Sequence, residues 1–599
     1  MQIHWWISFC LAVVLIIAFM GFAIGFGKYR KTKKIKLLPI AMLVCFSSAM
    51  VLAVPAFCAQ YSLSGYDALA SVAMALGKAI KVFGGDSIYE EAINNINSIP
   101  EQIRGAYIGA MLLVQVWAPL CTISVLLSAL KNISSFLHYY FGHKRDTYVF
   151  SSLNAKSYEL AKSIRANDKR CVLVFTDIND SDNDSINGDL LNEVKKLKAI
   201  SFSRDILAID FKRHSPKKKL IFIMINDDET VNIAQGLKVL EEYRDRDNTE
   251  MYVVTTATPG ELLLTAAQKG KMIVKRINET ASLINRIIYE DKMGIFENAI
   301  DVGKKEKLVS ELVVGMGSHG TEMVKTLSWY CQMDGFELLV NAFDADSLAE
   351  DKFRAKAPEL MSDKFNGKNV PGEAHYTINI HSGINVETET FRERIREIKN
   401  ISYVLVSLGD DELNIKTAVM LRILFEQMGI KPYIHAIVYS SEQCRALKGL
   451  CNFKGKSYDI DFTGDLSSSY SADMIFENEI AKLALKCHFG WGGNEQDFWN
   501  YEYNYRSSMA AAMHILARRR CKIPFADKKV SEMTDDEIKA LGYLEHRRWN
   551  AYMRSQGYIY SGSQDSSTRN DLGFMHHNLV PNGVLELENY KKDLNVGIN

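Results

Sequence analysis

Long apolar runs near the N-terminus give way to short apolar segments alternating with polar ones further along the chain. Three stretches are apolar and free of Asp, Glu, Lys and Arg: roughly Trp5–Phe26, Leu37–Ala59 and Ala106–Leu130. Each has the length of about 20 residues that a helix needs to cross a bilayer. We therefore expect residues 1–134 to form a transmembrane domain with three helices and an outer loop.

Basic residues predict how these helices are oriented. A dense cluster of Lys and Arg lies between the first two stretches, from Lys28 to Lys36, and short loops of this kind stay in the cytoplasm. The N-terminus and residues 60–104 would then lie outside. The first stretch does not resemble a cleaved signal peptide, because its positive charge follows the apolar run. We expect a multi-pass protein of the cell inner membrane, in contact with the lipid bilayer, with its C-terminal domains in the cytoplasm.

The outer loop contains two further patterns. Ser71–Val82 has helical periodicity with an apolar face, which predicts a helix lying on or dipping into the membrane. Leu63–Asp67 is similar to the T-V-G-Y-G filter of potassium channels but lacks the second glycine. We therefore do not expect a potassium filter at this position.

The clearest motif of the cytosolic part is a glycine-rich turn. An apolar run, Leu312–Val314, leads into Gly315, Gly317 and Gly320, and a helical pattern follows. This is G-x-G-x-x-G between a strand and a helix, the context in which a backbone can approach a phosphate closely. A second strand ends at Asp344, where a carboxylate can accept hydrogen bonds from ribose hydroxyls. We predict nucleotide binding here; the alternative is that the glycines serve packing alone.

The same layout occurs earlier in the chain without its glycines. Ser151, Ser152 and Asn154 follow the first cytosolic strand at the positions where glycines would stand. Further along, each copy has a buried strand, an acidic turn and a helix, at Asp227 in the first and Asp410 in the second. Strands alternating with helices predict parallel sheets with right-handed crossovers. We expect a degenerate Rossmann-like domain at 146–295 and a second at 308–490.

This arrangement resembles the regulatory nucleotide-binding domains of potassium transport systems, the TrkA-N or RCK type. The resemblance rests on the glycine motif and Asp344 of the second copy. It implies paired Rossmann units that bind nucleotides or ions and pull on transmembrane helices. Ser151 and Ser152 depart from the pattern, so it does not imply two equivalent dinucleotide sites.

The last hundred residues carry a second set of motifs. The order Glu545-His-x-x-Trp549-Asn, then x-x-Gly557-Tyr, then His577-x-Leu-Val-Pro and a terminal Lys-x-Asp593 resembles the ryanodine-receptor repeat (RyR) domain, at residues 500–599. The resemblance implies a small helical module that binds a nucleotide-derived ligand. Aromatic rings beside guanidinium groups suit a purine base and its phosphates. The candidate ligand-binding residues are Glu545, His546, Arg548, Trp549, Tyr552, Arg554 and Tyr558. The alternative is a structural role, with Trp549 in the core and Glu545 and His546 bracing the fold.

Composition narrows the classes of function. Basic and acidic residues are equal in number, 71 each, which argues against a nucleic-acid-binding surface. Ten cysteines show neither a C-x-x-C pair nor a Cys/His cluster at metal spacing, so no metal site or disulfide framework is indicated. No His/Asp or Lys/Tyr signature accompanies the glycine loop, and His319 is interpreted as a loop residue. An NAD-dependent oxidoreductase is therefore a minor alternative.

Together these patterns predict a ligand-gated effector or channel-like protein in the membrane. The resemblance to RyR domains implies that a nucleotide-derived signal, such as a cyclic nucleotide, an ADP-ribose derivative or NAD, binds the cytosolic module in antiphage defence. We expect a homo-oligomer, a tetramer or larger, because three uncharged helices from one chain cannot easily enclose a wet pore. The alternative is a nucleotide-sensing regulator or subunit of potassium or other cation transport.

Overall fold

In the computed structural model, the chain forms two compact units, Met1–His138 and Tyr139–Asn599. The described residues are 2–29, 37–60, 65–87, 94–142, 144–178, 185–256, 270–290, 294–361, 375–450, 452–453, 456–476 and 479–594.

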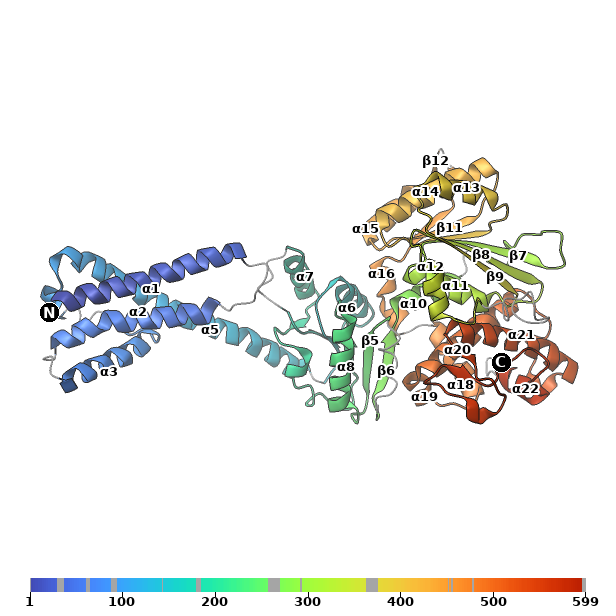
Figure 1. The fold of residues 1–599 in the computed structure, drawn as a ribbon. Coiled ribbons are helices and arrows are strands. Elements are labelled where there is room, and N and C mark those ends of the chain that lie inside the picture. Colours follow the sequence, from blue (N-terminus) through green and yellow to red (C-terminus); the bar gives the residue numbers. More distant parts are fainter. Residues whose placement is uncertain are drawn as a thin grey trace. The chain divides into compact units, whose positions relative to one another are not determined.

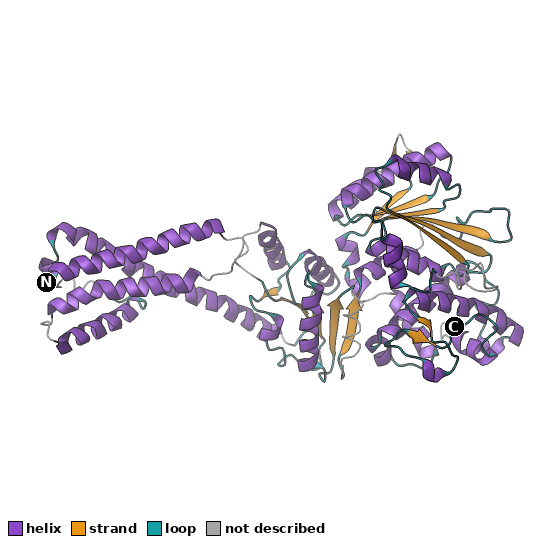
Figure 2. Ribbon diagram, viewed as in Figure 1, coloured by secondary structure: helices purple, strands orange, loops and turns teal. Residues whose placement is uncertain are grey.

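The first unit is built from helices (Figure 2). Its elements are α1 (Gln2–Tyr29), α2 (Leu37–Gln60), α3 (Gly65–Val82), η1 (Ile96–Ser98) and α5 (Glu101–Gly142), the last of which extends beyond the unit. Two stretches, Ile40–Ala59 and Glu101–Leu126, are long and apolar enough to cross a membrane. The shorter apolar stretch Ile3–Phe19 lies in α1. Two of the three expected spans therefore meet this test, and a third span stays a prediction.

Small side chains allow these helices to approach closely. Ala49 and Ala53 of α2 and Ala75 of α3 are buried, as is common where helices pack in a membrane. The Tyr107 hydroxyl of α5 donates to the Leu52 carbonyl at 2.6 Å. Exposed apolar side chains lie on the outer surface, an arrangement that soluble proteins avoid over large areas. They include Leu11, Val14 and Ile17 on α1 and Leu112, Val116 and Leu120 on α5.

The helix expected at Ser71–Val82 is present as part of α3, with Val72, Leu76 and Ile80 exposed. Most of the basic cluster that predicts orientation, residues 30–36, lies outside the described residues, as do residues 63 and 64 at the start of the filter-like segment. The orientation across the membrane therefore stays a prediction.

The second unit contains two six-stranded sheets, in which every paired strand is parallel to its neighbours. The strand orders are β3-β2-β1-β4-β5-β6 and β14-β11-β10-β7-β8-β9. In each sheet the first strand lies at the centre beside the fourth, which is the doubly wound Rossmann order. The prediction of two such domains is thus confirmed at the level of sheet topology (Figures 1 and 2).

The strands of the first sheet are β1 (Thr147–Phe150), β2 (Val172–Phe175), β3 (Ile200–Ser201), β4 (Leu220–Met224), β5 (Thr249–Val254) and β6 (Ile273–Ile277). Those of the second are β7 (Lys307–Val314), β8 (Phe336–Asp344), β9 (Tyr376–Ser382), β10 (Tyr403–Val406), β11 (Tyr433–Ile437) and β14 (Ile460–Thr463), with a separate hairpin of β12 (Asn452–Phe453) and β13 (Lys456–Ser457). The central strands β4 and β10 are buried along their whole length, because helices cover both faces of a parallel sheet.

The helices of the first domain are α6 (Ala155–Asn167), α7 (Ser185–Lys196), η2 (Ile206–Ala208), α8 (Glu229–Tyr243) and α10 (Glu279–Glu290). Those of the second are α11 (Ser318–Tyr330), α12 (Ala349–Lys356), α13 (Glu389–Glu397), α14 (Asp411–Met428), α15 (Ser441–Leu450), α16 (Leu466–Ser469) and α17 (Ala472–Ile475). Figure 1 shows α13, α14 and α15 on one face of the second sheet and α10, α11 and α12 on the other.

The last helices of the two domains are exchanged. Helix α10 follows the first sheet but packs its Leu283 and Ile287 into the core of the second domain. Helices α16 and α17 follow the second sheet but contact α6 of the first, where the Ala472 amide donates to the Ser163 hydroxyl at 2.9 Å. This exchange joins the two domains into one body.

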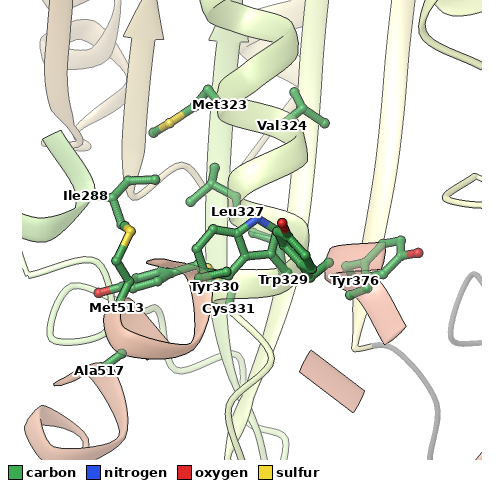
Figure 3. Packing of buried hydrophobic residues seen from close by; sticks show 14 of the residues in the cluster. Ile288, Met323, Val324, Leu327, Trp329, Tyr330, Cys331, Tyr376, Met513 and Ala517 are labelled. Atoms are coloured by element: carbon green, nitrogen blue, oxygen red, sulfur yellow. The ribbon is translucent and has the colours of Figure 1, made fainter. Parts of the chain in front are cut away.

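The C-terminal module is mainly helical. It contains α18 (Glu479–Gly490), α19 (Glu495–Asn500), α20 (Glu502–Arg520), η3 (Val530–Glu532), α21 (Asp535–Ser555), β15 (Ile559–Tyr560), η4 (Ser566–Thr568), β16 (Met575–His576) and α22 (Leu587–Leu594). Figure 3 shows Leu327 and Tyr330 of α11 lying with Ile288 of α10 and with Met513 and Ala517 of α20. Helix α11, which follows the glycine loop, is therefore held between the second sheet and the module.

Candidate functional site

The three glycines of the loop after β7 have different roles. Gly315 has a φ of 98°, and a Cβ there would lie 2.4 Å from the Ser407 carbonyl oxygen. A Cβ on Gly320 would lie 1.8 Å from the Gly315 carbonyl oxygen. Both positions therefore require glycine for the loop to close. Gly317 differs, because among the described residues no heavy atom outside its neighbouring backbone lies within 4 Å of the place a Cβ would occupy, so the backbone there is open to the surroundings.

Gly317 is also the N-cap of α11, and as a glycine it has no side chain with which to cap this helix. The amide groups of its first turn thus have no side-chain acceptor from the cap position, and the helix dipole places partial positive charge there. This is the arrangement by which helix N-termini bind phosphate.

In the first Rossmann-like domain, a side chain caps the equivalent helix N-terminus. The Asn154 side chain caps α6 by accepting from the Ser157 amide, and the Ser157 hydroxyl completes a capping box. The Ser151 hydroxyl accepts from the Ile225 amide at 2.9 Å. The polar residues that replace the glycines thus accept hydrogen bonds from nearby loop and helix amides. Because these amides already have acceptors, we expect no phosphate to bind at this copy.

Asp344 ends β8 beside the glycine loop. One carboxylate oxygen accepts from the Met316 amide at 2.6 Å, and the other accepts from the Asp346 amide at 2.7 Å. The carboxylate therefore fixes the loop, and its remaining lone pairs are available to accept from a ribose hydroxyl. The structure brings Asp344 and the glycines Gly315 and Gly317 to one cavity, while Gly320 packs beneath them.

This cavity, called the loop cavity below, has a volume of about 540 Å³, within the range of ligand pockets. It lies at the carboxyl ends of β7, β8, β10 and β11, the switch point where ligands bind in doubly wound sheets. One wall comes from the first domain, through Lys156, Glu229 and Glu279. The Lys156 ammonium donates to the Glu279 carboxylate at 2.6 Å, so a cation and an acid of the first domain face the glycine loop of the second.

His319 lies in the wall of the loop cavity, where its Nδ1 is 3.3 Å from the Tyr439 hydroxyl. Burial lowers the pKa of His319 below its ordinary value of 6.5, although Glu279 and Glu322 oppose the shift. The imidazole is therefore mainly neutral at pH 7, and its partner is a phenol. This geometry fits the interpretation of His319 as a loop residue.

Four of the predicted residues of the C-terminal module point inward. Glu545, His546, Arg548 and Arg554 are at most 2% exposed. The Glu545 carboxylate accepts two hydrogen bonds from the Arg548 guanidinium, at 2.7 and 3.0 Å. Its other oxygen lies 3.5 Å from His514 Nδ1 and 3.7 Å from Arg518 Nη1.

The charged groups of this buried cluster shift one another's pKa values. Burial alone would raise the pKa of Glu545, but Arg548, His514 and Arg518 hold it well below its usual range, so the carboxylate is ionised. Burial lowers the pKa of His514 to about 4, so this imidazole is neutral at pH 7. A buried carboxylate shared by two guanidinium groups is stable only while it stays paired.

The E-H-x-x-W-N motif holds the H-x-L-V-P segment in place. His546 Nε2 donates to the Val580 carbonyl at 3.0 Å, and Asn550 Nδ2 donates to the same oxygen at 2.9 Å. The half-buried Trp549 stacks on His546 and meets the His576 ring edge-on. The geometry therefore supports the alternative interpretation, in which Glu545, His546 and Trp549 brace the fold. Arg548 pairs with Glu545, and Arg554 lies 3.8 Å from Glu359. Both arginines are buried, so a ligand would reach them only by opening the module.

Tyr552 and Tyr558 are also buried, but they border a cavity. Both line a second cavity of about 810 Å³, between α11, α12 and the C-terminal module, called the module cavity below. The sequence did not predict other residues of its wall as ligand contacts, among them Glu322, Lys325, Arg506 and Gln556. The available signal was the polar stripe Ser318, Thr321, Glu322 and Lys325, whose spacing puts these residues on one face of α11.

Within the described residues, no group of three or more His, Cys, Asp or Glu side chains is arranged to hold a metal ion. Comparison with models of known protein families and with curated proteins found no match. The function therefore has to be inferred from the geometry of the two cavities.

Proposed function

We propose that this chain is a membrane-embedded, ligand-gated effector whose cytosolic domains sense a nucleotide-derived signal. The observation that carries the proposal is the uncapped N-terminus of α11 at Gly317, which opens into the loop cavity beside Asp344. A phosphate would accept hydrogen bonds from the first-turn amides. A ribose would donate to the Asp344 carboxylate.

The charge of the loop cavity narrows the class of ligand. Among the described residues of its lining, Lys156 is the single Lys or Arg, and it is paired with Glu279. Four carboxylates, those of Glu229, Glu279, Asp344 and Glu387, share the lining. Backbone amides, not cationic side chains, would therefore hold the phosphate. This favours a ligand of low charge, such as an ADP-ribose derivative, NAD or a cyclic nucleotide, over a nucleoside triphosphate.

Chain connectivity supports coupling to the membrane. Helix α5 contains the apolar stretch Glu101–Leu126 and ends at Gly142, close in sequence to β1. Tyr139, the first residue of the second unit, is buried, and its ring meets Phe211 of the first domain edge-on at 5.3 Å. A ligand that binds one arrangement of the domains more tightly than another would shift the population of that arrangement. In a homo-oligomer of four or more chains this shift would open or disrupt the membrane, as an antiphage defence effector requires.

A second candidate function is a nucleotide-sensing regulator or subunit of potassium or other cation transport. It is favoured by the tandem of doubly wound sheets with one intact glycine loop. This support comes from the fold and is weaker than support from a site.

Thermal unfolding of the full chain in detergent tests ligand binding. NAD, ADP-ribose, ATP and cyclic oligonucleotides would each be added at about 100 times their dissociation constant, where binding stabilises by about 2.7 kcal/mol. We expect stabilisation by a low-charge nucleotide that Gly317→Val abolishes and the exposed substitution Glu393→Ala preserves. Light scattering on the same samples tests the oligomer, and a monomer with and without ligand would contradict the effector model.

A further inference from the structure

The module cavity has one aromatic wall and one polar wall. Tyr503, Tyr552, Tyr558 and Phe574 line it from the C-terminal module. The Tyr558 ring lies 5.1 Å from Phe574 and 6.3 Å from Tyr503, centroid to centroid. Such a group of rings binds flat aromatic ligands by stacking, with little dependence on the identity of the base.

The polar wall comes from α11 and from the start of α20. Lys325 Nζ lies 4.0 Å from the Glu322 carboxylate, and Arg506 Nε donates to Glu502 at 2.8 Å. Arg506 also donates to the Gln556 side-chain oxygen at 3.2 Å. Among the described residues, the lining contains the cations Lys325, Lys356 and Arg506 and the acids Glu322, Glu502 and Asp571.

This balance of charge favours a nucleoside over a free phosphate as the occupant of the module cavity. A free phosphate would meet as many carboxylates as cations, and two of the three cations, Lys325 and Arg506, are paired with neighbouring acids. A base with its ribose is uncharged and offers both donors and acceptors. The paired polar groups and the rings therefore fit a nucleoside better than an isolated phosphate.

The module cavity meets the loop cavity at the N-terminus of α11. Thr256, Thr280 and Ser318 line both, and Ser318 is the first residue of α11. Lys325 lies seven residues further along the helix, roughly 10 Å along its axis. A phosphate at the helix N-terminus is thus within reach of groups in either cavity.

We propose that the module cavity binds a second nucleoside group of the same ligand, so that the ligand is a dinucleotide with one nucleoside in each cavity. The inference rests on the proposed function, since it places the connecting phosphate at Gly317. The base stacks against Tyr552 and Tyr558, and the ribose or the base edge reaches Glu322 and Gln556. Because α11 contributes to the polar wall and the C-terminal module contributes to both walls, such a ligand holds the module against the second Rossmann-like domain.

Calorimetric titration of the full chain in detergent tests this inference with cyclic di-AMP, NAD and AMP. AMP has one nucleoside and fills a single cavity. Tyr558→Ala removes a stacking surface, so we expect dinucleotide affinity to fall by about 10- to 100-fold and AMP affinity to stay within about threefold. Since Tyr558 is buried and its loss could disturb folding, Glu322→Gln serves as a second variant of unchanged shape. Tyr543→Ala, outside the cavity lining, is the control.

The outcomes distinguish failure of the second subsite from failure of the proposed function. Loss of dinucleotide binding alone in Tyr558→Ala or Glu322→Gln, with loss of all binding in Gly317→Val, supports the bipartite ligand. Binding that depends on Gly317 but is unchanged in both module variants overturns the second subsite and leaves the loop cavity as the sensor. If neither dinucleotide nor AMP binds the wild-type chain, the proposed function and the second subsite both fail.

Discussion

Replacing Glu545 by alanine should open the C-terminal module. The carboxylate is 2% exposed and lies among Arg548, Arg518 and His514. Glu545→Ala would leave two buried guanidinium groups without their shared anion. Removing one partner of a buried ion pair costs about 3–5 kcal/mol, which changes an opening equilibrium by roughly two to four powers of ten.

Hydrogen–deuterium exchange of the full chain in detergent is a suitable assay, because it reports local opening in a protein that does not unfold in one step. We expect amides of α20 and α21 to exchange about 100- to 5,000-fold faster in Glu545→Ala. The exposed Glu588, whose carboxylate lies 3.9 Å from Lys591 Nζ, provides the control. Glu588→Ala should change exchange less than about threefold, since exposed ion pairs contribute little.

Acid should act on the same cluster. The pKa of Glu545 is lowered in the folded state, so its stabilising contribution is present above the unfolded value of about 4.3 and is lost as pH falls below it.

The reasoning would be refuted if Glu545→Ala left protection unchanged while abolishing ligand binding, because Glu545 would then be a ligand contact.

Two further predictions concern the second Rossmann-like domain. Burial raises the pKa of Glu311 in β7 well above its ordinary value, so each pH unit above about 4.3 should lower the stability by about 1.4 kcal/mol while the folded carboxyl stays protonated. Glu311→Gln should remove this slope in melting curves measured from pH 4 to 8, and superimposable wild-type and variant profiles would contradict the assignment. Gly315→Ala adds a Cβ 2.4 Å from the Ser407 oxygen at a φ of 98°, which should cost roughly 2–5 kcal/mol and lower the melting temperature. Gly317→Ala should melt like the wild type, and equal melting of both variants would show that the loop is built differently.

Repeated local patterns made much of the fold predictable. Short apolar strands, acidic turns and helices recur in the same order twice, and chirality leaves few ways to connect them. The loop cavity was predictable for the same reason, since Gly315, Gly317 and Asp344 follow strands whose carboxyl ends meet at one edge. The exchange of α10 with α16 and α17 was not predictable, because periodicity identifies an apolar face without identifying what covers it.

The same limit explains the C-terminal module. Arg548 and Arg554 carry charge, and their helical spacing places them near aromatic residues, so they resembled ligand contacts. Their burial depends on neighbours distant in sequence: His514 lies beside Glu545, the partner of Arg548, and Glu359 lies beside Arg554. The module cavity likewise exists only because α11 packs beside α21, two helices separated by more than two hundred residues.

The most direct test of the central claim is a calorimetric titration of wild-type and Gly317→Val full chains with NAD, ADP-ribose and cyclic di-AMP. The account predicts that at least one of them binds the wild type and none binds Gly317→Val, although both proteins melt at the same temperature. Equal binding to the two proteins, or no binding to the wild type, would contradict a nucleotide site at the N-terminus of α11.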